Sequence, residues 1–97
     1  MDEYIERIRK LVLARLGSEP VKIVVFGSVA RGENDHSSDV DVGIFPKEGR
    51  IDRVKVALLR EELDESTIPY RVEIVLMNEV PEKLARQAES EGLVWKE

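Results

Sequence analysis

The sequence predicts a small α/β (α+β) domain in which helices flank a mixed three-stranded sheet. Apolar residues recur at helical spacing in two segments, and short β-branched segments bounded by turn residues lie between the helices. The chain has 97 residues, which is enough for one modest hydrophobic core but not for a catalytic domain plus a substrate domain. We therefore expect residues 1–97 to form a single domain.

The first two elements are an amphipathic helix and a buried strand. Within residues 2–16, apolar side chains recur three and four residues apart, and Glu and Arg occupy the opposite face. Residues 17–20 contain Gly, Ser and Pro, which end the helix. Residues 21–26 are almost continuously apolar and β-branched, as is typical of a strand buried on both faces. Gly27 and Ser28 end this strand.

Two further strands show alternation between apolar and polar positions. In residues 39–45, one face carries Val40, Val42 and Ile44 and the other carries Asp39, Asp41 and Gly43. In residues 70–76, the inward face carries Val72, Ile74 and Leu76 and the other carries Arg71, Glu73 and Val75. Few residues separate the first two strands, so we expect them to be antiparallel neighbours. The helix before the third strand permits a parallel crossover.

Two further helices complete the predicted fold. One spans residues 51–65, where apolar residues cover a broad arc, and the last begins at Pro81 and ends near Gly92, a predicted left-handed cap. Residues 93–95 are expected to add a short docking segment. In that segment Trp95 is predicted to close the core rather than to contact a partner.

Composition excludes several kinds of site. The chain has no cysteine and one histidine, which excludes disulfides, thiolate nucleophiles and Cys-based or His-rich metal sites, so that carboxylates must hold any metal. The 15 Lys and Arg residues against 20 Asp and Glu residues give a net charge of −5, which argues against direct nucleic-acid binding. No apolar run approaches the ~18 residues that span a bilayer, and the amino terminus lacks a signal-peptide core. We therefore expect no membrane association and a cytoplasmic location.

The segment that carries chemistry joins a glycine turn to a pair of aspartates. Gly27 allows the backbone to turn sharply and to approach a ligand closely, and a short helix starting at Ser28 would direct free N–H groups at a phosphate. Asp39 and Asp41 place both carboxylates on one face of a strand, where they repel each other unless a cation lies between them. Oxygen-only ligands with open positions suit Mg²⁺, which takes its remaining ligands from water and substrate phosphates.

These motifs resemble those of a known family. The pattern G-S-x-A-R-G at residues 27–32, followed by S-D-x-D at residues 38–41, resembles the signature of the minimal nucleotidyltransferases, the smallest members of the DNA polymerase β-like nucleotidyltransferase superfamily. The order of predicted helices and strands also matches that family over most of the chain. The resemblance therefore implies a nucleotidyltransferase core like the palm of polymerase β.

The resemblance implies transfer of a nucleoside monophosphate, typically AMP from ATP, to a hydroxyl group with release of pyrophosphate. Asp39 and Asp41 would bridge two Mg²⁺ ions. A third carboxylate, which by position falls on Glu73, would bind the catalytic metal and help deprotonate the acceptor. The family's usual residue there is aspartate, so Glu73 departs from the pattern, and Arg71 on the same face offers it a simple surface ion pair instead.

The same resemblance assigns nucleotide-binding roles to four residues. Gly27 and Ser28 would hold the β- and γ-phosphates. Arg31 would either neutralise phosphate charge or pair with a carboxylate of the loop. Ser38 belongs to the motif, and its hydroxyl most simply shapes the loop by bonding nearby backbone. The loop residue His36 is predicted to be solvated rather than a catalytic base.

Three functions remain open from the sequence. The resemblance favours an enzyme that acts as an antitoxin, because minimal members of the family are commonly paired with a HEPN-domain toxin that they AMPylate on tyrosine. A second reading is a non-catalytic module that neutralises its partner by occlusion, which the departure at Glu73 favours. A third is a nucleotidyltransferase for small molecules whose pocket is completed by another subunit or a homodimer.

Overall fold

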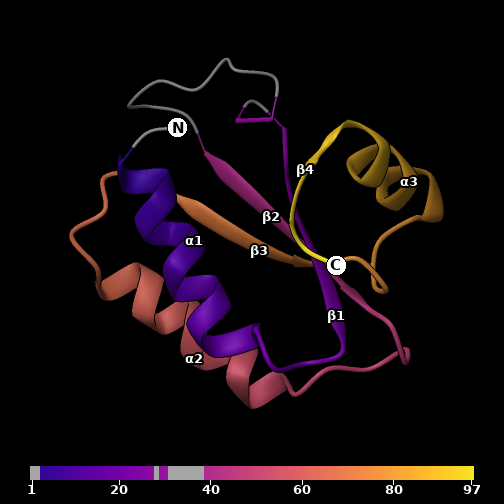
Figure 1. The fold of residues 1–97 in the computed structure, drawn as a ribbon, viewed down its shortest axis with the longest axis horizontal. Coiled ribbons are helices and arrows are strands. Elements are labelled where there is room, and N and C mark those ends of the chain that lie inside the picture. Colours follow the sequence, from indigo (N-terminus) through magenta and orange to yellow (C-terminus); the bar gives the residue numbers. More distant parts are fainter. Residues whose placement is uncertain (1–2, 28, 31–38) are drawn as a thin grey trace.

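The computed structural model describes residues 3–27, 29–30 and 39–97, which form three helices and one four-stranded sheet (Figure 1). In chain order the elements are α1 (Glu3–Leu16), β1 (Val21–Phe26), β2 (Val40–Pro46), α2 (Arg53–Glu65), β3 (Val72–Leu76), α3 (Glu82–Glu91) and β4 (Leu93–Lys96). The predicted α/β architecture is confirmed. The predicted count of three strands is wrong, because β4 adds a fourth.

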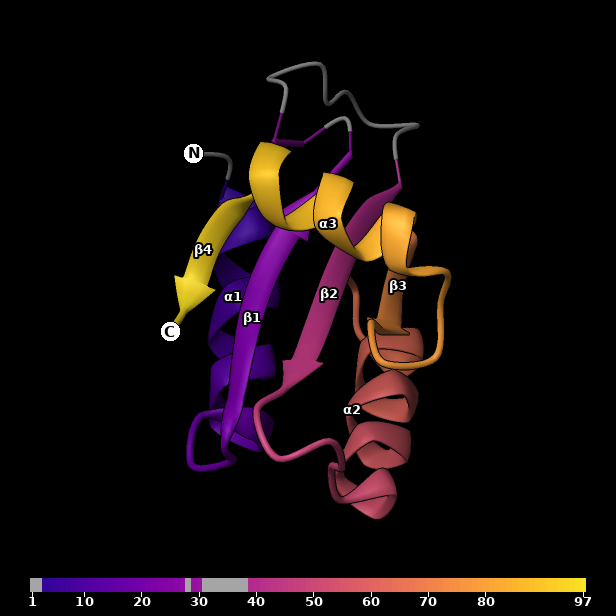
Figure 2. The same ribbon diagram turned by 90° about the vertical axis from the view of Figure 1, so that its right-hand side faces the viewer.

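The sheet has helices on both faces. Helices α1 and α2 lie side by side on one face, and α3 crosses the other face near the end of β1 (Figure 2). The main core lies between the sheet and the first two helices. Its fully buried members include Ile5, Ile8, Val12, Leu16, Val21, Ile23, Val25, Val40, Val42, Ile44 and Leu59. Each buried Leu, Ile or Val side chain contributes about 1.5–3 kcal/mol.

The strand connections follow the sequence prediction. Strand β1 pairs antiparallel with β2, and β2 pairs parallel with β3 across the α2 crossover. The strand order is β3-β2-β1-β4, so β1 and β2 are central. The predicted inward residues of β3 are also confirmed, since Ile74 and Leu76 are buried.

Strand β4 replaces the predicted docking segment. Residues 93–96 pair antiparallel with β1. The segment is only four residues long, and both Leu93 and Val94 are more than two-fifths exposed, so it lacks the alternation that marks a longer strand. Trp95 is 9% exposed and belongs to the core. Its predicted role in closing the core is confirmed.

Gly92 is not the predicted left-handed cap. Its φ of −81° and ψ of 167° are extended backbone that any residue adopts. Glycine is required there for a different reason, because a Cβ would lie 2.1 Å from Cγ1 of Val24 and 2.8 Å from the carbonyl oxygen of Val25. The chain therefore passes directly against β1 as it leaves α3.

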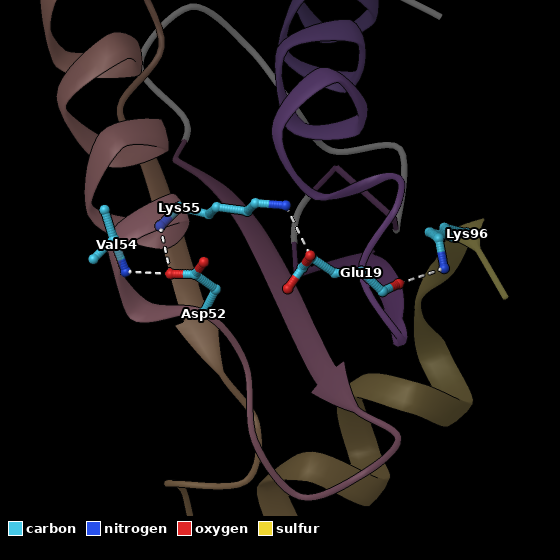
Figure 3. Close-up of polar contacts among 5 residues, drawn as sticks. All are labelled: Glu19, Asp52, Val54, Lys55 and Lys96. Carbon is cyan, nitrogen blue, oxygen red and sulfur yellow. Dashed lines mark hydrogen bonds and ion pairs between the residues drawn. The ribbon is translucent and has the colours of Figure 1, made fainter.

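Glu19 lies just before β1 and links the start of that strand to α2 and to β4 (Figure 3). Its carboxylate accepts a hydrogen bond from Nζ of Lys55 at 2.8 Å, and its carbonyl oxygen accepts one from Nζ of Lys96 at 3.1 Å. The Glu19 hydrogen bond raises the pKa of Lys55. Asp52 caps α2 by accepting hydrogen bonds from the backbone N–H groups of Val54 and Lys55. These contacts fix the end of the sheet that lies away from Asp41.

No helix in the described ranges has the length and apolar character that crossing a membrane requires.

Candidate active site

The register of the sheet aligns acidic residues at the end of β1. Asp41 of β2 pairs with Phe26 of β1 on one side and with Glu73 of β3 on the other. Residues paired across neighbouring strands point to the same face of a sheet. The carboxylates of Asp41 and Glu73 therefore share the face that α3 covers in part, opposite the core residues Val40 and Val42.

Gly27 and Asp41 are in close contact where β1 ends. Gly27 has a φ of +75°, in the left-handed region that favours glycine. A Cβ at this position would lie 2.6 Å from Oδ2 of Asp41. The predicted sharp turn at Gly27 is therefore present. It allows the carboxylate of Asp41 to lie directly against the backbone.

The surroundings of Asp41 disfavour its charged form. Partial burial raises the pKa of Asp41, and the negative charges of Glu73 and then Asp39 raise it further. Asp39 lies one residue before β2 and is exposed. Glu73 and Asp39 are thus each close enough to Asp41 to disfavour its negative charge.

Asp41→Asn is expected to raise the melting temperature of the metal-free protein at neutral pH. The folded-state pKa of Asp41 lies above its unfolded value. Ionisation of this carboxyl therefore lowers the free energy of unfolding, and this is the penalty that the charged form imposes. Asparagine removes that penalty. The gain should therefore be largest above the raised pKa and should shrink as pH falls through it, which thermal unfolding in a chelator at several pH values will measure. A gain that grows toward acid pH would contradict the electrostatic account of Asp41.

Glu73 lies nearer the surface than Asp41. Its side chain is 46% exposed, and Nη2 of Arg71 lies 3.7 Å from its Oε1. This is the surface pair that the spacing offered as the alternative to a catalytic role, and such a pair contributes at most ~1 kcal/mol. Over residues 3–27, 29–30 and 39–97, no three acidic or histidine side chains converge closely enough to hold a metal ion.

The donor chemistry nevertheless fits Mg²⁺. Asp39, Asp41 and Glu73 offer only carboxylate oxygens, the ligands that Mg²⁺ prefers. The repulsion that raises the pKa of Asp41 is the kind that a divalent cation relieves. Glu73 would have to turn from Arg71 toward Asp41 to complete a three-carboxylate set.

Four of the residues singled out in the sequence lie outside the described residues. These are Ser28, Arg31 and Ser38, predicted to bind nucleotide, and His36, predicted to be solvated. Gly27 is the member of the predicted nucleotide-binding set that the structure describes.

The sequence did not predict the pocket beside Gly27. It has a volume of about 180 Å³ and is lined by Phe26, Gly27, Leu84, Gln87, Ala88 and Glu91. The helical members recur at three- and four-residue spacing, which places them on one side of α3. The sequence contains that spacing, but it does not predict that this side of α3 faces Phe26 and Gly27.

Comparison with known proteins places the chain in a family. Residues 7–96 match the family model described as Polymerase beta, Nucleotidyltransferase. A solved structure described as a minimal nucleotidyltransferase is similar, with a TM-score of 0.72 and 33% identity over 96% of this chain and 95% of that chain. No curated protein matches significantly.

Two toxin–antitoxin crystal structures share the fold. One was solved with AMP-PNP and has a TM-score of 0.71 at 21% identity over 97% of this chain and 73% of that chain. The other is a mutant MntA-HpeT toxin–antitoxin, with a TM-score of 0.67 at 19% identity over 93% of this chain and 70% of that chain. The resemblance inferred from the sequence motifs is confirmed by the family match. This chain belongs to the polymerase beta nucleotidyltransferase family.

Proposed function

We propose that this protein is a Mg²⁺-dependent nucleotidyltransferase that transfers AMP from ATP to a tyrosine hydroxyl of a HEPN-type toxin and so acts as an antitoxin. The observation that carries the proposal is the Asp41 carboxylate, which lies against the left-handed turn at Gly27 with Glu73 and Asp39 near enough to raise its pKa. The toxin–antitoxin structures of the same fold, one of them with AMP-PNP, support the choice of nucleotide and partner.

The proposed reaction is an in-line displacement at the α-phosphorus of ATP. The tyrosine oxygen forms a bond to that phosphorus, the bond from the α-phosphorus to the bridging oxygen breaks, and pyrophosphate leaves. Glu73 receives the hydroxyl proton. Asp39, Asp41 and Glu73 would hold Mg²⁺, which when bound stabilises charge on the entering and leaving oxygens.

The remaining motif residues bind the nucleotide in this proposal. The turn at Gly27 brings backbone N–H groups to the β- and γ-phosphates, and the Ser28 hydroxyl adds a donor. Arg31 either neutralises phosphate charge or pairs with a loop carboxylate. Ser38 supports the loop that leads into β2.

A transfer assay tests the proposal directly. Wild-type protein, the Asp39→Asn/Asp41→Asn double variant and the control Asp64→Asn, an exposed position on α2, are each incubated with Mg²⁺, ATP labelled at the α-phosphate and a purified HEPN-type toxin. We expect label on the toxin with wild type and with the control, and none with the double variant. Equal labelling by wild type and the double variant would refute the catalytic role of the aspartates.

Glu73→Gln is expected to lower transfer by about a hundredfold, because it removes the proposed proton acceptor, while ATP binding changes little. Single-turnover transfer and equilibrium binding of Mg²⁺-ATP measure the two quantities. Arg71→Gln is the matched control, since it breaks the same ion pair but keeps the carboxylate. If the two variants transfer AMP equally well, Glu73 serves only the surface pair.

The exposed position of Glu73 favours a second candidate function. Its pairing with Arg71 and the lack of a converged metal site in the described ranges are compatible with a module that neutralises a toxin by occlusion alone. Toxin neutralisation by the Asp39→Asn/Asp41→Asn variant separates the two functions. Full neutralisation by this variant supports occlusion, and loss of neutralisation supports catalysis.

A further inference from the structure

The pocket between β1 and α3 has one rigid wall. Helix α3 contributes Leu84, Gln87, Ala88 and Glu91 to it. The close approach of Gly92 to Val24 fixes the end of α3 against β1. The pocket is therefore a feature of the packed fold rather than of a loop.

The pocket adjoins the candidate active site at Gly27. Gly27 lines the pocket and is also the residue against which the Asp41 carboxylate lies. The Asp41 carboxylate points away from the core residues Val40 and Val42, toward the sheet face that α3 crosses. A ligand that places its phosphates beside Gly27 and Asp41 therefore has this pocket next to it for the rest of its structure.

The lining suits a nucleoside rather than a phosphate. Phe26, Leu84 and Ala88 are apolar, and the 41% exposure of Leu84 leaves its side chain available to a flat ring. Among the residues that the structure describes, no lysine or arginine lines the pocket. The carboxylate of Glu91 repels phosphate groups but can accept hydrogen bonds from ribose hydroxyls, as acidic residues do in other nucleotide sites.

Gln87 supplies the group that can distinguish bases. A glutamine amide carries an acceptor and a donor side by side, which match the exocyclic N6 amino group and N7 of adenine. Guanine presents two acceptors at these positions. Gln87 is exposed and lines the pocket. Its amide is therefore not packed in the core and can turn toward a ligand.

We infer that this pocket is the nucleoside subsite of the protein, in which Phe26 and Leu84 contact the base, Glu91 binds the ribose and Gln87 selects adenine. The inference rests on the proposed use of a nucleotide. It assigns the base preference to α3, an element outside the glycine and aspartate motifs.

Binding of two non-hydrolysable analogues tests the subsite. AMP-PNP and GMP-PNP are titrated with Mg²⁺ into wild type and into Gln87→Leu, Leu84→Asp and Arg86→Leu. The last places the same leucine on α3 outside the pocket lining, at a residue that is 74% exposed. We expect Gln87→Leu to weaken AMP-PNP binding about tenfold and to leave GMP-PNP binding unchanged. Leu84→Asp should weaken both analogues, and Arg86→Leu neither.

The outcomes separate this inference from the proposed function. Wild type that binds AMP-PNP, with Gln87→Leu and Leu84→Asp both within twofold of its affinity, overturns the subsite but leaves nucleotide use intact. Wild type that binds neither analogue overturns both. Because Gln87 and Leu84 are exposed, circular dichroism and melting temperature should show that the variants remain folded.

Discussion

Asp41→Asn is expected to lower nucleotidyl transfer by about a thousandfold. Asparagine keeps the size of the side chain and one oxygen but loses the negative charge that would hold Mg²⁺. A thousandfold loss corresponds to about 4 kcal/mol of transition-state stabilisation, within the several kcal/mol that a metal ion supplies. Single-turnover transfer of AMP with saturating Mg²⁺ and toxin measures the effect.

The stability of the same variant provides the internal control. Asp41→Asn relieves a repelled carboxylate in the metal-free protein, so lost activity should accompany an equal or higher melting temperature. Such opposition between stability and activity is common at functional sites. Transfer by the variant within tenfold of wild type would show that Asp41 does not act in the reaction.

Gly92→Ala is expected to destabilise the fold by about 3 kcal/mol, the upper end of the usual cost of overpacking. The new methyl group would lie 2.1 Å from Cγ1 of Val24 and less than 3 Å from the carbonyl oxygens of Ala88 and Val25. The backbone oxygens cannot move without disturbing α3 or β1. For a domain of this size the melting temperature should fall by roughly 15 °C.

Gly49→Ala is the matched control for Gly92→Ala. Gly49 has a φ of +77°, and a Cβ there would have no neighbour within 4 Å. Its substitution should therefore cost only the backbone strain, about 1 kcal/mol. Equal losses in the two variants would contradict the close packing of Gly92 against β1. Thermal and urea denaturation of both variants provide the comparison.

Most of the fold could be predicted because its longer elements bury one regular face. Helix α1 repeats its apolar residues over 14 positions and β1 is almost wholly apolar, so both were recognisable without tertiary information. The observed boundaries agree with the predicted ones to within two residues. Strand β4 could not be recognised because its pairing depends on a partner strand far away in the sequence.

The candidate site was predictable only in part, for a similar reason. Gly27 and Asp41 carry local signals, a turn after a buried strand and an acid on an alternating strand, and the structure brings them together. The spacing of Arg71 and Glu73 allowed a surface pair as the alternative to a catalytic role, and the structure contains that pair. The sequence did not predict that α3 lines the pocket beside Gly27. An amphipathic pattern identifies the apolar face of a helix but not the element against which that face packs.

The position of β4 has a consequence for how the chain folds. Val24 and Val94 are paired but lie 70 residues apart in the sequence, and contacts of such long range form slowly. Until β4 docks, one edge of the apolar, β-branched strand β1 remains unpaired. Such an edge is a template for aggregation. Substitutions that weaken β4 should therefore reduce the yield of soluble protein during synthesis more than their effect on equilibrium stability suggests.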